Sequence, residues 1–388
     1  MPDGLTPSNA PWLLCMGTRP EIVTMAPVYR ALRAAGERVS VLHAGQDDAD
    51  AWPLYRLFAM RPECEIALSQ PRAGQAHLTG ELLARIGEAI EFIRPRTVLV
   101  QGAAFAALAA ATAAYFAGIP VGHVGAGLRA HPMRELREEK NREMIARLAA
   151  LHFAPTVEAR ANLLREGIDD AHIVVTGSTV VDSTRLAIER LRVSGDPAVD
   201  AEVTDFIAAH AAHRLVTVSA DGRERGDAGI DSIAAAVVRI LREHADVAVV
   251  WPMIANPAVA QAVAAGLAGL DPLSAARLLL APSIEYPTLI ATLQASWIVL
   301  SDCGGFDEEA LAMGVPTLAC RAAAERPEIL PANYTQPAGT SVDSICMAFD
   351  ALTFDRAAYA SKRWPAGVSP LGDGHAGERI VEALLQTV

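Results

Sequence analysis

The chain has 388 residues and a formal net charge of −12, which argues against a general nucleic-acid binder and against a protein that binds anionic membranes. Hydrophobic residues make up 52% of the chain and aromatic residues only 5%, which is typical of a globular, helix-rich protein and excludes a disordered one. This length suits two domains of ordinary size and can bury ample apolar surface.

The cysteines and the apolar runs predict a cytoplasmic location. Five cysteines are scattered without Cys-x-x-Cys spacing, so we expect mostly buried thiols and no zinc site. No run of roughly 18 apolar residues is present to cross a membrane, and residues 1–12 lack the basic and apolar parts of a signal peptide. No ligand cluster of suitable type and spacing is visible, so we predict neither a metal nor a cofactor.

The first predicted element is a strand over residues 12–16, followed by a turn at Gly17 and an amphipathic helix. Strand, glycine turn and helix in this order form the first half of a βαβ unit. Arg19 follows the carboxyl end of the strand, where open α/β sheets bind their ligands. Arg19 is therefore either a ligand contact or a solvated loop arginine.

The alternation continues through strands over residues 37–43, 97–100 and 119–124. The helix after residue 104 is rich in alanine and has almost no polar face, so we expect it to be packed on both sides. His123 is either a catalytic group or a histidine that satisfies hydrogen bonds in the core. Arg129 leaves the last of these strands at the ligand-binding edge, which favours a ligand contact.

Residues 137–142 begin a charged helix. Glu138 and Arg142 are four residues apart and therefore lie on one helical face. From composition alone, a solvated charged helix start is the favoured explanation.

The second half repeats the alternation with strands over residues 215–218, 247–251 and 278–280. A further strand over residues 297–300 leads into Cys303, Gly304 and Gly305, and we expect a short helix from about residue 307 and a strand over residues 316–319. A glycine pair that opens a helix lets backbone N–H groups approach an anion, which the helix dipole also favours.

In the first turn of that expected helix, Glu308 and Glu309 are placed to accept hydrogen bonds from a sugar diol. The alternative is an ordinary strand-to-helix turn with acidic residues.

Several motifs together resemble the non-hydrolysing UDP-N-acetylglucosamine 2-epimerases. They are GTRPE at residues 17–21, PVGHVGAGLR at 120–129, REEKNR at 137–142, SDCGGFDEEA at 301–310, ERPE at 325–328 and LGDGHA at 371–376. The resemblance covers essentially the whole chain and implies a GT-B-like α/β fold, with two doubly wound Rossmann-type domains facing across a cleft. We place residues 1–183 plus 366–388 in an N-terminal domain with the sugar-side residues, and residues 184–365 in a C-terminal UDP-binding domain.

The ligand implied by the resemblance is UDP or a UDP-sugar, with UDP-GlcNAc favoured, and the implied assembly is a homodimer. The reaction implied is an anti elimination of UDP followed by re-addition with inversion at C2. The residues implied for catalysis are Glu138, with His123 or Asp221 as substitutes for missing groups. The residues implied for substrate binding are Arg19, Arg129, Arg142, Arg223, Asn256, Cys303, Gly304, Gly305, Glu309 and Arg326.

The chain departs from the family pattern around the sugar. Ala103 and Gly125 stand where two catalytic carboxylates are usual, Thr24 replaces a lysine, and Ile254 replaces a histidine. A second cleft histidine is also missing, and aspartates at residues 47 and 48 argue against a regulatory UDP-sugar site. Three hypotheses follow: an epimerase with reduced activity, a UDP-sugar-dependent glycosyltransferase or hydrolase, and a non-catalytic UDP-sugar binder.

Overall fold

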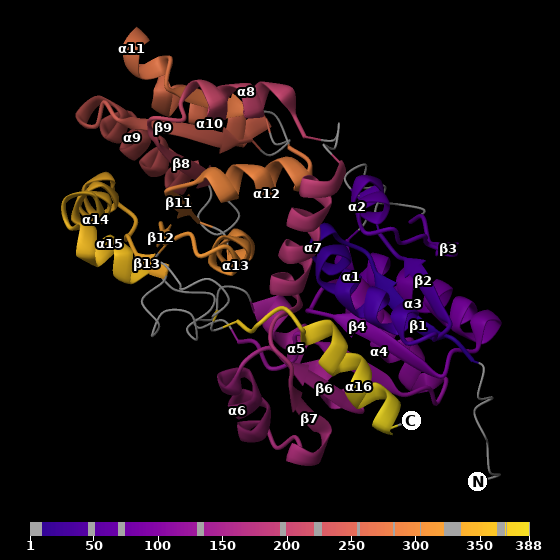
Figure 1. The fold of residues 1–388 in the computed structure, drawn as a ribbon. Coiled ribbons are helices and arrows are strands. Elements are labelled where there is room, and N and C mark those ends of the chain that lie inside the picture. Colours follow the sequence, from indigo (N-terminus) through magenta and orange to yellow (C-terminus); the bar gives the residue numbers. More distant parts are fainter. Residues whose placement is uncertain are drawn as a thin grey trace, which may run out of the picture. The chain divides into compact units, whose positions relative to one another are not determined.

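In a computed structural model of the chain, helices and strands alternate through two units, each built on a parallel sheet (Figure 1). The first unit consists of Met1–Leu186 with Leu371–Val388, and the second of Ala187–Pro370. The structure describes residues 10–45, 51–68, 74–129, 136–194, 199–220, 227–253, 257–281, 284–302, 304–321, 335–362, 369 and 371–387.

The sheet of the first unit has the order β3-β2-β1-β4-β5-β6-β7 within these residues, and all neighbouring strands are parallel. Its strands are β1 (Trp12–Met16), β2 (Val39–His43), β3 (Cys64–Glu65), β4 (Thr97–Gln101), β5 (Val121–Val124), β6 (Leu151–Ala154) and β7 (Ile173–Val175). The strand order reverses between β1 and β4, which makes the sheet doubly wound. Every residue of β1 is buried, as expected for a parallel strand with helices on both faces.

The helices of the first unit are α1 (Arg19–Ala34), α2 (Ala51–Leu57), α3 (Gln75–Ile93), α4 (Phe105–Phe116), α5 (Leu136–Leu148), α6 (Val157–Arg165), α7 (Thr179–Ser194, which runs into the second unit) and α16 (Ala376–Thr387). Helix α4 packs against α3, α5 and the sheet, so most of its alanines are buried within this unit. This confirms the packing expected for the alanine-rich helix.

Helix α16 returns from the far end of the chain and packs on α1 (Figure 1). A Cβ atom at Gly377 would lie 2.8 Å from the carbonyl carbon of Pro27, so only glycine allows this close approach. The backbone N–H of Gly377 donates to Oδ1 of Asp182 at 2.9 Å. The last described residues are therefore an integral part of the first unit.

The sheet of the second unit has the order β10-β9-β8-β11-β12-β13 within the described residues, again with all pairs parallel. Its strands are β8 (Arg214–Ser219), β9 (Val247–Pro252), β10 (Leu278–Ala281), β11 (Ile298–Ser301), β12 (Thr317–Ala319) and β13 (Thr335–Pro337). The helices are α8 (Ala201–Ala209), α9 (Asp227–Glu243), α10 (Pro257–Leu267), α11 (Pro272–Ala275), α12 (Tyr286–Ala295), α13 (Gly304–Ala312), α14 (Val342–Phe354) and α15 (Arg356–Lys362). Valine and isoleucine from β8, β9 and β11 pack with α9 and α14 to form its core.

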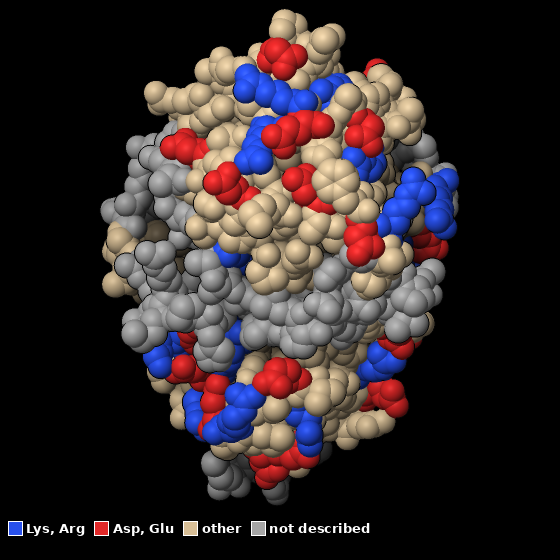
Figure 2. Space-filling view, turned by 90° about the vertical axis from the view of Figure 1, so that its left-hand side faces the viewer, with Lys and Arg blue, Asp and Glu red and all other residues tan. Residues whose placement is uncertain are grey.

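Three properties that were considered in the sequence can be examined in the structure: the surface charge, the apolarity of the helices and the state of the cysteines. On the face in Figure 2, Lys and Arg side chains lie among Asp and Glu side chains and do not gather into a patch of one sign, as far as the described residues show. In the described part of the chain, no helix has the length and apolarity required to span a bilayer. Of the described cysteines, Cys15, Cys320 and Cys346 are buried free thiols, and Cys64 is half-buried.

Candidate functional site

In the second unit, the strand β11 leads directly into α13, whose first two residues are Gly304 and Gly305. The prediction that this helix begins near Asp307 was wrong by one turn. Glycine is tolerated at the start of a helix, so the glycine pair forms the first turn instead of a separate loop. Backbone N–H groups near the start of α13 lack carbonyl partners within the helix, and its dipole is positive at this end.

Because α13 begins earlier than predicted, Glu308 and Glu309 lie further along the helix than expected. Asp307 lies in the first turn, and Glu308 and Glu309 follow in the second turn instead of the first. Glu308 is buried, whereas Glu309 is half-buried. Of the two, the carboxylate of Glu309 is therefore better placed to meet a ligand.

A buried ion pair, which the sequence analysis did not identify, holds this helix start in place. A guanidinium nitrogen of Arg321, just beyond β12, donates to Oδ2 of Asp307. The two side chains are 2% and 1% exposed. The only signal in the sequence was an arginine directly after a buried strand, at the edge of the sheet where ligands bind.

In the first unit, the turn between β1 and α1 places Arg19 as the first residue of α1. Two residues later, Glu21 folds its carboxylate back over this turn. Its Oε2 accepts hydrogen bonds from the N–H groups of Gly17 and Thr18, each at 2.8 Å, and from the hydroxyl of Thr18 at 2.9 Å. Burial raises the pKa of Glu21 to about 7 although these hydrogen bonds oppose the shift.

The turn after β4 is held by two side chains from other elements. Nε2 of His123, on β5, donates to the carbonyl oxygen of Gly102 at 2.9 Å. Nδ2 of Asn141, on α5, donates to the carbonyl oxygen of Ala103 at 2.9 Å. Burial lowers the pKa of His123 to about 3, so the ring is neutral near pH 7. This geometry favours a structural role for His123, and its catalytic role stays a prediction.

Gly125 follows β5 with φ +73°, a conformation that residues with a side chain rarely adopt. A Cβ atom there would lie 3.4 Å from Nε2 of Gln101, at the end of β4. The amide of Gln101 therefore lies next to one of the two positions that lack the expected carboxylate. Sequence reasoning did not single out Gln101, because only strand pairing brings it next to Gly125.

The guanidinium of Arg129 is already engaged. Its Nε and Nη2 donate to the two carboxylate oxygens of Glu166 at 2.7 and 2.6 Å, and its Nη1 donates to the carbonyl oxygen of Leu128 at 2.6 Å. A ligand that binds Arg129 must compete with this bidentate pair. The predicted ligand contact stays a prediction.

On α5, Glu138 and Arg142 share one face as predicted, with 3.7 Å between their charged atoms. Arg142 also donates to Glu139. The carboxylate of Glu138 is 59% exposed and is thus accessible to a substrate, as a catalytic base must be.

Five of the predicted site residues lie outside the described residues. They are Asp221, Arg223, Asn256, Cys303 and Arg326. Residues 46–50, on which the argument about a regulatory site depends, also lie outside them.

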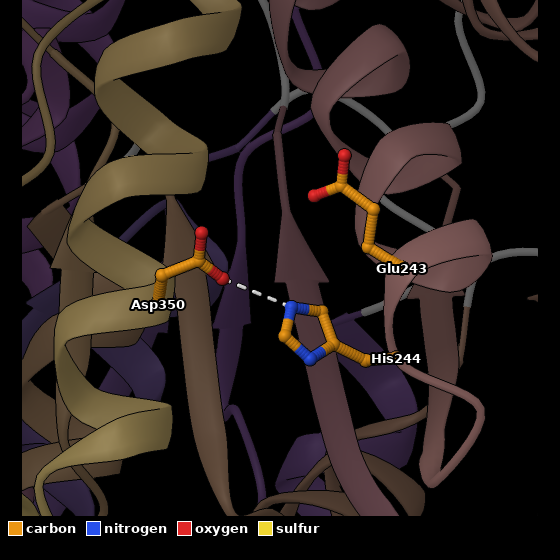
Figure 3. A group of neighbouring side chains, drawn as sticks. All are labelled: Glu243, His244 and Asp350. Carbon is orange, nitrogen blue, oxygen red and sulfur yellow. Dashed lines mark hydrogen bonds and ion pairs between the residues drawn. The ribbon is translucent and has the colours of Figure 1, made fainter.

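A separate cluster in the second unit brings together Glu243, His244 and Asp350 (Figure 3). Their ligand-type atoms lie within 4.8 Å of one another. His244 Nε2 and Asp350 Oδ1 are 2.9 Å apart and hydrogen-bonded, and Arg239 pairs with Glu243 at 3.0 Å. The hydrogen bond between His244 and Asp350 links the end of α9 to α14, so we assign this pair a structural role.

Comparison with known proteins gives one family. The family model for UDP-N-acetylglucosamine 2-epimerase matches residues 30–385. A probable UDP-N-acetylglucosamine 2-epimerase of Ralstonia nicotianae is 36% identical over 379 residues, which cover 96% of this chain and 98% of that protein.

Two solved structures are similar throughout. The UDP-GlcNAc 2-epimerase of Neisseria meningitidis bound to UDP-GlcNAc has a TM-score of 0.87 and 28% identity, with 97% of this chain and all of the other covered. The S. aureus MnaA–UDP co-structure has a TM-score of 0.86 and 28% identity, with 98% of each chain covered. These likenesses confirm the GT-B-like class of two Rossmann-like α/β domains.

Proposed function

The chain belongs to the UDP-N-acetylglucosamine 2-epimerase family, and on this premise we propose that it interconverts UDP-GlcNAc and UDP-ManNAc. The observation that carries the proposal is the family match over residues 30–385, which includes motifs of both units, among them PVGHVGAGLR and SDCGGFDEEA. The comparisons do not favour the alternatives, a glycosyltransferase or hydrolase and a non-catalytic binder.

The proposed reaction breaks two bonds of the sugar and re-forms them. A base removes the proton at C2 while the bond from C1 to the UDP oxygen breaks, which leaves a glycal and free UDP. A proton then adds to the opposite face of C2, and the UDP oxygen re-forms its bond to C1. No carbonyl group acidifies the C2 proton, so a positioned base and stabilisation of the leaving UDP are both required.

We propose that the second unit stabilises the UDP. The start of α13 offers backbone N–H groups and a positive dipole to the diphosphate. The half-buried carboxylate of Glu309 accepts hydrogen bonds from the ribose diol. In the first unit, we propose that Arg19 contacts the substrate, as the family resemblance implies.

We propose that Glu138 acts as a proton-transfer group at C2, because its carboxylate is exposed and held on one face of α5 by Arg142. Ala103 and Gly125 lack the side chains of the two other carboxylates that the family resemblance implies. We therefore expect turnover slower than that of a family member with both carboxylates by about a hundredfold or more, since general acid–base groups each contribute about that much.

The test is incubation of the protein with UDP-GlcNAc in heavy water, followed by NMR. We expect deuterium at C2 and formation of UDP-ManNAc. Glu138→Gln should slow both by about a hundredfold or more. Glu143→Gln is the matched control, because Glu143 is also an exposed, ion-paired glutamate on α5 and should leave the rate unchanged.

The same experiment separates the alternatives. Free GlcNAc or a glycosylated acceptor without deuterium at C2 would favour a hydrolase or transferase. Calorimetric binding of UDP-GlcNAc with no turnover would favour a binder. A homodimer and a cytoplasmic location stay predictions.

A further inference from the structure

The turn between β1 and α1 has the geometry of an anion site, but a side chain of the same turn occupies it. In doubly wound sheets, the diphosphate of a nucleotide often binds at the first strand-to-helix turn, against backbone N–H groups at the helix start. Here the N–H groups of Gly17 and Thr18 both donate to Oε2 of Glu21 at 2.8 Å.

The surroundings leave little room for another ligand at this turn. A Cβ atom at Gly17 would lie 2.2 Å from the carbonyl oxygen of Ala44, so the backbone directly after β2 closes one side. Glu21 is only 2% exposed, and its Oε1 is buried without a hydrogen-bond partner. An external phosphate can reach the two N–H groups only if it displaces this carboxylate.

The same hydrogen bonds fix the backbone on the N-terminal side of Arg19. Thr18 caps α1 in an extended conformation and is held through its N–H and its hydroxyl, and Arg19 is the next residue. Glu21 follows Arg19 by two residues, and its carboxyl group is bonded to the two residues that precede Arg19. The backbone is therefore held on both sides of Arg19.

We propose that the carboxyl group of Glu21 closes the β1–α1 turn to phosphate and positions Arg19 for the UDP-sugar. This inference rests on the proposed function, because Arg19 is a ligand contact only if a UDP-sugar binds. Glu21 is a positioning residue in this proposal and touches no substrate atom.

A double-mutant cycle tests the positioning role. Glu21→Ala removes the acceptor of three hydrogen bonds, and we expect the KM for UDP-GlcNAc to rise about tenfold or more. Glu21→Gln keeps an oxygen that accepts the same hydrogen bonds and should stay within about threefold of the wild type. In an Arg19→Ala background, Glu21→Ala should raise KM no further, because it acts through Arg19.

A second measurement tests the closure of the turn. With saturating UDP present, inorganic phosphate should raise the melting temperature of Glu21→Ala but not that of the wild type, because only the variant exposes the N–H groups. If Glu21→Ala does not fold, Glu21→Asp replaces it in both experiments, since the shorter side chain cannot reach both N–H groups.

The outcomes separate this inference from the proposed function. A wild type that neither binds nor converts UDP-GlcNAc contradicts the proposed function. A wild type that works, with a KM that Glu21→Ala leaves unchanged or raises equally with and without Arg19, overturns the positioning role alone. Equal stabilisation of wild type and variant by phosphate overturns the closure.

Discussion

The buried ion pair between Asp307 and Arg321 gives the sharpest test of the second unit. We consider Asp307→Ala, which removes the carboxylate and leaves the guanidinium in place. The side chains of Asp307 and Arg321 are 1% and 2% exposed, so both charged groups lie out of contact with bulk water. Removal of one member of a buried ion pair typically costs about 3–5 kcal/mol, because the remaining buried charge loses its ion-pair partner.

A simple Coulomb estimate of the attraction between the two charges gives an energy of similar magnitude. Two unit charges about 4 Å apart attract by about 4 kcal/mol at an effective dielectric constant of about 20. A single domain is typically stable by about 5–15 kcal/mol, so we expect Asp307→Ala to remove a large part of the stability of this unit.

The assay is urea unfolding followed by circular dichroism, with the free energy of unfolding compared between variants. The matched control is Glu243→Ala, which breaks an exposed pair with Arg239 whose side chains are 41% and 48% exposed. That change should cost less than about 1 kcal/mol. The double variant Asp307→Leu with Arg321→Met should cost less than Asp307→Ala, because no charge is left buried. The reasoning is refuted if Asp307→Ala costs no more than the control.

Four further predictions concern the first unit. Gly127→Ala should destabilise the protein by more than about 2 kcal/mol, because Gly127 has φ +78° and a Cβ atom would lie 2.1 Å from the carbonyl oxygen of Ala159. Gly87→Ala, inside α3 with nothing within 4 Å of the added carbon, should instead stabilise it by about 0.5–1 kcal/mol, both measured by urea unfolding. The pKa of Glu21 rises to about 7 on folding from about 4.3 in the unfolded chain, so its stabilising contribution is full below about pH 4 and is lost as the pH rises through 7. Glutamine does not titrate, so Glu21→Gln removes this pH-dependent loss of stability, which is on the order of 3 kcal/mol. The difference in urea midpoint between Glu21→Gln and the wild type should therefore rise from pH 5 to pH 8. A difference that stays constant would contradict the raised pKa of Glu21. The ring of His123 should show no change in its nitrogen NMR shifts between pH 5 and pH 8, because burial lowers its pKa to about 3.

Most described strands could be predicted from sequence because they are short apolar runs next to a glycine or polar turn, but β3, β6, β7 and β13 were not predicted. The predictions for residues 12–16, 97–100 and 247–251 agree with β1, β4 and β9 to within one residue. The start of α13 was predicted wrongly, because glycines were taken as a turn although their backbone also forms the first turn of a helix. The local sequence pattern therefore predicts the position of a buried strand well and the first residue of a helix poorly.

The candidate site was less accessible to sequence reasoning because its contacts join distant residues. Arg129 was expected at a ligand, but its partner Glu166 lies 37 residues away and no local pattern links them. Gln101 meets Gly125 only because β4 and β5 are neighbours in the sheet. The shared face of Glu138 and Arg142 was predictable, because a spacing of four residues is a property of the helix itself.

The return of α16 to α1 has a consequence for synthesis on the ribosome. All of the second unit is translated before residues 376–387 appear, so its sheet can form while the first unit still lacks the helix that covers α1. Until then, the surface around Pro27 stays uncovered, because Gly377, which packs against it, lies 350 residues downstream. A ribosome that stops before this helix releases a chain with a complete second unit and an open first one, which is a natural substrate for chaperones and proteases.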